Sequence, residues 1–462
     1  MTEILPGVSR AIAVAATIAL LSSPSLAQNG DTVSRGVGGV VPISLGDAAR
    51  LAARQSAIAQ GARLRADEAQ ARVRQRRADL LPNLSAYANQ SGHTFNTATF
   101  GIDFPSPPGQ PPIFDPAGQV EGPVNLVDIR GRVQQSLLDF SAIGRVRSAQ
   151  AQARSSNADA DATAEQAATI ATTAYVRAMR ADADLRARQA DTLLATELLR
   201  IAQSQLQAGT GVALDVTRAQ AQLAATRASL IGSRNTRDHS RLDLLRALAL
   251  PVGTEIALTD SLSPAAPRES LADEATLVDQ AIRNRPDLVA EEERVRAARQ
   301  GLSAIKAERL PTLGLVADDG AIGKTGGKLL NTYTWGLQVT LPIFDGFRRE
   351  ARVQEQRSVV KEAEIRRRDL EQQAQADVRG ALLDLGNARE QVAAAAERLR
   401  LAEQELAQAR DRFNAGVAGN ADVVNASLAL TSSRTLVNDA ETAYQLARVA
   451  LARATGSVTT LR

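Results

Sequence analysis

Apolar residues near the C-terminal end of the chain recur at the spacing of a coiled coil. Alanines fill positions 388, 395, 402 and 409, and larger apolar residues alternate with them at Val392, Leu399, Leu406 and Phe413. Alternating steps of four and three residues are the period at which two helices interlock their side chains. The same period resumes after a short glycine-containing segment and runs from Val423 to Leu451. The pattern predicts an antiparallel helical hairpin with its tip at about 415–420.

A second, looser copy of this pattern lies earlier in the chain. Leu185, Thr192, Ala195, Leu199, Ala202 and Leu206 follow a similar period, and the predicted tip is at about 208–213. Ala208-Gly209 and Asp215-Val216 reappear without gaps as Ala415-Gly416 and Asp422-Val423. Self-similarity of this kind indicates a repeated structural unit. We therefore assign repeat 1 to residues 28–250, a Pro-containing linker to 251–274 and repeat 2 to 275–462.

Each repeat is predicted to contain one very long helix and two shorter ones. The long helices are expected at 141–207 and 345–415, and each would be about 100 Å long at about 1.5 Å per residue. The shorter helices are expected at 45–80, 213–250, 275–310 and 421–454. Two of these placed end to end match one long helix, which predicts a tall sheaf of helices with turns at one end.

Four short segments alternate between apolar and polar residues instead. They lie at about 84–96 and 126–138 in repeat 1 and at about 313–318 and 332–343 in repeat 2. One apolar and one polar face over about ten residues is typical of a transmembrane strand beside a water-filled lumen, and the alternative is a half-buried strand of a soluble sheet. Tyr333 and Trp335 suit a lipid-facing aromatic belt. Four strands are too few for a closed barrel, so membrane strands would require two, three or four chains to share one.

Composition and charge reduce the number of function classes that fit this sequence. The chain has no cysteine, which excludes disulfides and thiolate metal sites. Its only histidines, His93 and His239, lack metal-ligand spacing, so we expect no enzyme activity, cofactor or metal. Acidic and basic residues interleave, which disfavours a nucleic-acid partner. Residues 1–27 are typical of a secretory signal peptide, with a buried or membrane-anchoring helix as the alternative.

Several motifs resemble those of the TolC family of outer-membrane efflux and secretion channels. They are Asn284-Arg-Pro-Asp-Leu288, Leu310-Pro-Thr-Leu313, Trp335 with Leu341-Pro-Ile-Phe-Asp-Gly346, and the two hairpin turns. The resemblance implies a mostly α-helical homotrimer with a 12-stranded β-barrel in outer-membrane lipid, continuous with an α-helical barrel in the periplasm. It also implies docking to a periplasmic adaptor (membrane fusion) protein and an inner-membrane RND or ABC-type pump.

The resemblance also suggests roles for individual residues. Asp215, Arg218, Asp422 and Asn425 would line the periplasmic aperture, although each Asp could instead simply favour its helix N-terminus. The tips at Gly209, Gly211, Gly416 and Gly419 would dock the adaptor. Pro342 fits a strand end, where no ladder donor is needed, and Gly346 a bend from barrel into tunnel.

Two other functions compete with an export channel. One is a periplasmic adaptor, which would carry one hairpin rather than two. The other is an exported coiled-coil scaffold, which would lack the strand–Pro–helix junction at 341–346. Within the channel hypothesis, drug or metal efflux competes with type I protein secretion.

Overall fold

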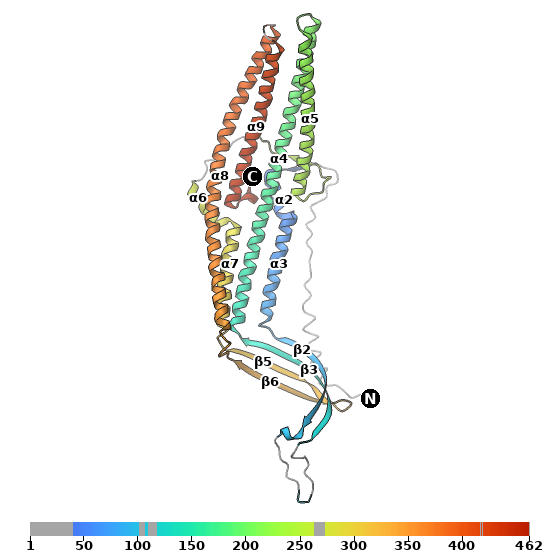
Figure 1. Cartoon of the computed structure of the whole chain (residues 1–462), viewed down its shortest axis with the longest axis vertical. Coiled ribbons are helices and arrows are strands. Elements are labelled where there is room, and N and C mark those ends of the chain that lie inside the picture. The colour runs from blue at the N-terminus through green and yellow to red at the C-terminus, as the bar shows by residue number, and fades with distance from the viewer. Residues whose placement is uncertain are drawn as a thin grey trace. The chain divides into compact units, whose positions relative to one another are not determined.

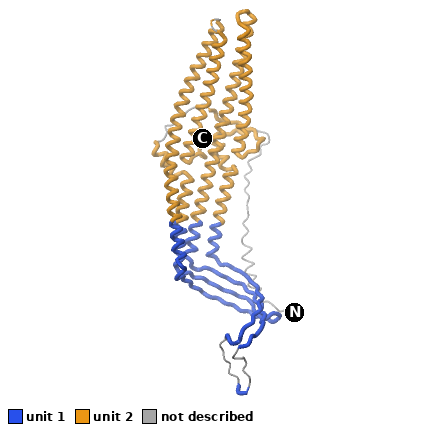
Figure 2. Tube along the Cα trace, viewed as in Figure 1, with its two compact units in different colours: residues 1–35, 72–149, 299–357 blue, residues 36–71, 150–298, 358–462 orange. Residues whose placement is uncertain are grey.

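The computed structural model describes residues 40–100, 107–109, 118–262, 273–415, 417 and 419–461. These residues form two compact units, shown in Figure 2. Unit 1 contains residues 72–149 and 299–357, and unit 2 contains residues 36–71, 150–298 and 358–462. The predicted signal peptide, part of the predicted linker and Gly416 lie outside the described residues.

The chain is mostly helical, as predicted (Figure 1). The two long helices are confirmed: α4 (Phe140–Gln207) has 68 residues and α8 (Arg348–Asn414) has 67. Each is followed by a shorter partner, α5 (Ala213–Ala247) or α9 (Asn420–Thr455). The N-terminal segment of each repeat is also helical, and two short 3-10 helices occur at Thr97–Phe100 (η1) and Val458–Thr460 (η2).

Those N-terminal segments are each two helices, whereas the sequence predicted one. The predicted helix 45–80 is α2 (Leu45–Gln55) followed by α3 (Ala57–Ala78), and 275–310 is α6 (Glu274–Asn284) followed by α7 (Pro286–Ala307). Arg285 has φ −66° and ψ 117°, because the ring of a proline disfavours helical backbone in the residue before it. Ser56 also has an extended backbone, although no proline follows it, and its hydroxyl accepts the N–H of Ala59.

Unit 1 contains a four-stranded antiparallel sheet in the order β2-β3-β5-β6. The strands are β2 (Asn83–Asn96), β3 (Val120–Leu138), β5 (Thr312–Lys324) and β6 (Leu330–Thr340). The prediction of 313–318 for the third strand was too short, because its glycines indicated a loop. In the structure Gly320 pairs with Arg130, and a Cβ there would collide with the Ile129 carbonyl. Glycine is therefore required by the close approach of two strands.

Unit 2 contains a second, parallel sheet that the sequence reading missed. It pairs β1 (Val41–Ile43) with β4 (Ile256–Leu258), so part of the predicted linker is a strand. The buried Tyr175 of α4 lies against this sheet, with its hydroxyl 2.8 Å from the Ile43 carbonyl oxygen and 3.0 Å from Oδ2 of Asp260. Burial raises the pKa of the Tyr175 hydroxyl, so it remains protonated and able to donate.

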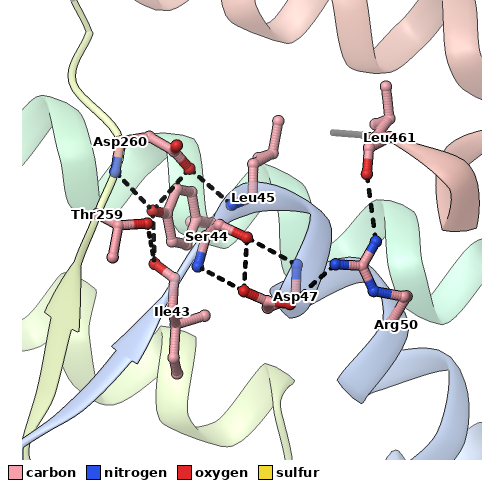
Figure 3. Close-up of polar contacts among 9 residues, drawn as sticks. Ile43, Ser44, Leu45, Asp47, Arg50, Thr259, Asp260 and Leu461 are labelled. Carbon is pink, nitrogen blue, oxygen red and sulfur yellow. Dashed lines mark hydrogen bonds and ion pairs between the residues drawn. The ribbon is translucent and has the colours of Figure 1, made fainter.

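The start of α2 is fixed by a capping box, visible in Figure 3. Ser44 accepts the N–H of Asp47, and the Asp47 carboxylate accepts both the hydroxyl and the N–H of Ser44. These hydrogen bonds lower the pKa of Asp47. Arg50 reaches the Leu461 carbonyl, and Glu165 of α4 accepts the N–H of Val458. Both ends of the described chain are thus attached to unit 2.

Polar contacts join the two repeats along α4 and α9 within unit 2. Asp191 is only 4% exposed, and its carboxylate lies 2.9 Å from Arg434 of α9. Asn438 donates to Asp184 at 2.7 Å, and Arg180 pairs with Asp439. A buried carboxylate without a cation would be costly, so the pair of Asp191 with Arg434 constrains the register between the two helices.

Candidate functional site

The register of the unit 1 sheet places its apolar side chains on one face. Leu313 pairs with Val339, Leu315 with Leu337 and Ala317 with Trp335. Ile129 and Val133 of β3 belong to the same face through their pairing with β5. The large side chains of this face are exposed in the chain: Leu84 60%, Ile129 46%, Tyr333 74%, Trp335 68%, Leu337 60% and Val339 69%. An exposed apolar face of this extent indicates contact with lipid or with another apolar surface.

The opposite face of the sheet carries charged and polar side chains. Arg130 lies 2.6 Å from Asp128 and 3.1 Å from Asp318, so its guanidinium is held between two carboxylates. The neighbouring Arg132 stacks over the ring of Tyr87 at 5.3 Å. Such a face is too polar for hydrocarbon and suits a wet lumen.

The helical hairpin of repeat 2 packs through the predicted seam. Ala395, Ala402, Leu406 and Phe413 of α8 are buried, as are Val423, Ala426 and Leu430 of α9. Leu194 and Leu198 of α4 complete the same cluster. Small residues at alternate seam positions allow close backbone approach. In repeat 1 the seam is less buried: Leu206 is 40% exposed, and α5 buries few residues near its start, namely Ala219 and Leu223.

The hairpin tips contain the glycines proposed for docking. Gly209 has φ 74°, a left-handed conformation that favours glycine after a helix end. A Cβ on Gly211 would lie 3.0 Å from Cβ of Gln205, so little space is left there. Gly419 is the residue before α9 and has ordinary φ, −79°.

The predicted aperture residues lie at the starts of α5 and α9. Asp215 and Asp422 each occupy the first turn of their helix, where an acidic group interacts favourably with the helix dipole. Arg218 lies 3.8 Å from Asp215, a long ion pair near the surface. Asp422 and Asn425 are exposed. Nothing in these contacts favours the pore-lining role over the helix-start role.

Asn420 is a residue at the tips that sequence reasoning missed. It is fully buried, and its Nδ2 donates to the Asp215 carbonyl oxygen at 3.0 Å. This hydrogen bond connects the start of α9 with the start of α5, the two hairpins of one chain. The available signal was a departure from the repeat, since the equivalent position in repeat 1 is Ala213.

The junction between β6 and α8 contains two left-handed residues. Pro342 follows the end of β6 at Thr340, and Gly346 and Phe347 have φ of 69° and 62°. Phe347 is not glycine, so its backbone carries strain that the surrounding junction must offset. The chain therefore turns sharply just before α8 begins. The repeat 1 junction is much shorter, because β3 ends at Leu138 and α4 begins at Phe140.

The Asn284–Leu288 motif forms an ion-pair network at the break between α6 and α7. Arg285 contacts Asp287 and Asp377, each at 2.8 Å. Burial of Asp287 opposes its ionisation, but the hydrogen bonds and charge of Arg285 outweigh burial and lower the pKa of this carboxyl. The motif thus holds the break in place against α8.

Among the described residues, no helix combines the length and apolar character needed to cross a membrane.

Comparison with known proteins identifies the family. The sequence model of the outer membrane efflux protein family matches residues 49–250 and 277–457. The chain belongs to this family. Its resemblance to TolC-type channels is thereby confirmed, and the two matched segments of this efflux family protein correspond to its two repeats.

Two curated proteins and one solved structure illustrate the similarity. The outer membrane efflux protein BepC of Brucella suis is 27% identical over 56% of this chain and 57% of its own length. The alkaline protease secretion protein AprF of Pseudomonas aeruginosa is 26% identical over 68% of this chain and 66% of its own. The matched regions thus span less than two thirds of either relative. The open MtrE outer membrane channel of Neisseria gonorrhoeae superposes with TM-score 0.74 at 19% identity, covering 90% of this chain and 89% of that one, and shares the fold.

Proposed function

We propose that this efflux family protein is a passive exit duct of the outer membrane, formed by three copies of the chain. The observation that carries the proposal is the sheet of unit 1, which has one exposed apolar face and one charged face. Its edge strands β2 and β6 have no further partner among the described residues. Open edges are not tolerated in lipid, so several copies must join into one barrel.

The number three comes from the family resemblance. Three sheets of four strands give a 12-stranded barrel, with the apolar face toward outer-membrane lipid and Arg130 and Arg132 toward the lumen. Tyr333 and Trp335 then contact lipid, and Pro342 and Gly346 mark the change from barrel to helical tunnel. The signal peptide would be removed after residue 27 during export.

The helical hairpins would extend into the periplasm and form the partner-binding end. Gly209, Gly211, Gly416 and Gly419 would dock a periplasmic adaptor, which links the duct to an inner-membrane RND or ABC-type pump. One relative is named for efflux and another for protease secretion. In this proposal the pump selects the cargo and the duct supplies no chemistry, so we infer no enzymatic role.

The mass of the detergent-extracted protein, from light scattering corrected for bound detergent, tests the proposal. We expect three chains per particle and extraction only with detergent. A monomer that is soluble without detergent would refute the duct and restore the periplasmic scaffold hypothesis.

Bilayer recordings then test the aperture. Asp215→Ala and Asp422→Ala should each reduce cation preference if three copies of each carboxylate line the opening. Unchanged selectivity in both variants would leave the two residues as helix-start groups only.

A further inference from the structure

Four helix ends meet the unit 1 sheet at one end of its strands. α3 and α7 end before β2 and β5 begin, and β3 and β6 end before α4 and α8 begin. The register places Asn83 opposite Gln134, Thr312 opposite Thr340 and Leu138 opposite Leu313, so these four strand termini lie at the same end of the sheet. Figure 2 shows the sheet and these helix ends together in unit 1. This end of the sheet therefore forms one boundary of the apolar face.

Large apolar side chains are exposed where the strands give way to helices. They are Leu81 60%, Phe140 44%, Leu341 55%, Ile343 91%, Phe344 73% and Phe347 70%. The rings of Phe344 and Phe347 contact each other edge to face, with centroids 5.5 Å apart. Exposed aromatic residues at the end of an apolar face are typical of the boundary between hydrocarbon and headgroups.

Basic side chains follow on the helices just beyond this boundary. Arg74 and Arg77 of α3, Arg147 of α4, Lys306 of α7 and Arg348 of α8 are all exposed. We call these five residues the basic collar. Arg77, Lys306 and Arg348 lie within about one helical turn of their helix ends, and Arg147 lies about 10 Å along its helix. The headgroup layer on each side of a bilayer is about 5–8 Å thick.

Four acidic residues next to this boundary are already engaged. Asp79, Asp139, Glu308 and Glu350 pair with other arginines, namely Arg76, Arg145, Arg352 and Arg309. For the five collar residues the described part of the chain provides no ion pair at 4.0 Å or less. The collar therefore leaves five positive charges per chain without a protein counter-charge.

We infer that the basic collar binds the anionic headgroups of phospholipids in the leaflet next to the helix ends. The inference rests on the proposed function, because the collar meets headgroups only if the sheet lies in a membrane. A basic residue near an anionic membrane surface gains about 1 kcal/mol, which is about a fivefold preference, and the gain is screened by salt. The collar would thus fix the depth of the barrel as well as select lipid.

Lipid retention by the purified full chain tests the inference. Detergent-extracted protein is mixed with equal amounts of phosphatidylglycerol and phosphatidylcholine, separated from free lipid, and its bound lipids are counted by headgroup. We expect at least about fivefold enrichment of phosphatidylglycerol at low salt. The enrichment should fall toward one in 0.5 M salt, where the Debye length is only a few ångströms.

Two matched triple variants locate the effect. Arg77→Gln, Lys306→Gln and Arg348→Gln together remove the collar charges nearest the sheet and should abolish the enrichment. Arg389→Gln, Arg398→Gln and Arg412→Gln remove three exposed charges of α8 in unit 2 and should leave it unchanged.

Each other outcome has a distinct meaning. Equal retention of both lipids by the natural sequence overturns the inference that the collar binds anionic headgroups, but it leaves the proposed duct function standing. Enrichment that survives in the collar variant also overturns it, because the lipid then binds elsewhere. Retention of neither lipid refutes the membrane location of the sheet and, with it, the proposed function.

Discussion

The two faces of β6 can be tested with neighbouring residues. Leu337 lies on the apolar face opposite Leu315, and Gln338 lies on the other face opposite Gly314. If the apolar face contacts lipid, Leu337→Arg places a charge in hydrocarbon, whereas Gln338→Arg adds one to a wet lumen. The two variants have the same new side chain one residue apart, so they differ in face rather than in composition.

The expected magnitude follows from the depth of Leu337. It lies three residues from the strand end at Thr340, which is about 10 Å along the strand and about 8 Å in depth for a tilt of about 40°. The midplane of an apolar band about 25 Å tall is about 12 Å from its edge. An arginine at the midplane costs about 2–4 kcal/mol, so we expect about 2 kcal/mol per chain at Leu337. In the proposed trimer, three chains would give about 6 kcal/mol, or about 10⁴-fold in the assembly equilibrium.

Trp335 provides the assay, because it is the only tryptophan of the chain and lies on the same face as Leu337. Folding into phospholipid vesicles is followed by its fluorescence, which brominated lipid should quench. We expect the natural sequence and Gln338→Arg to fold and their Trp335 fluorescence to be quenched. Leu337→Arg should fold only at a much lower concentration of denaturant. Equal folding of the two variants, or no quenching of Trp335 in the natural sequence, would refute our assignment of the faces.

Three further predictions concern unit 2. Tyr175→Phe removes a hydroxyl that donates to the Ile43 carbonyl and the Asp260 carboxylate, and it should lower the free energy of unfolding by about 1–2 kcal/mol in denaturant titrations. An unchanged midpoint would show that the β1–β4 sheet does not depend on this contact. Burial raises the pKa of Glu441, so the folded state is most stable with this group protonated and loses stability as pH rises through that pKa. Glu441→Gln should therefore stabilise the protein by about 0.5 kcal/mol at pH 7 but not at pH 4, as thermal melts at both values would show. Asn420→Ala removes the bond between the two hairpins of one chain and should increase channel opening in bilayer recordings; unchanged opening would make that bond purely structural.

The long helices were predictable because their signal repeats many times. The heptad repeat from Val392 to Phe413 contains four agreeing positions seven residues apart, and each supports the same period. The strand faces were predictable for the same reason, and the register between β5 and β6 bears out the alternation around Trp335.

Features that depend on only one or two residues could not be predicted from the sequence pattern. The helix break at Arg285 is signalled only by the following Pro286, and the break at Ser56 only by a serine. β1 and β4 have three residues each, too few to show a period, and their pairing joins segments far apart in the sequence. The buried Asn420 depends on a contact across two hairpins, which no local pattern contains.

The bond from Asn420 to Asp215 makes the two hairpins of each chain chemically different, because Ala213 at the equivalent place in repeat 1 has no such donor. A trimer would then present six hairpins with threefold rather than sixfold symmetry. Six identical partner molecules binding around it would meet two kinds of site in alternation. Their binding isotherm should accordingly have two phases of three molecules each, and a partner that binds all six hairpins must accommodate both kinds of contact with one surface.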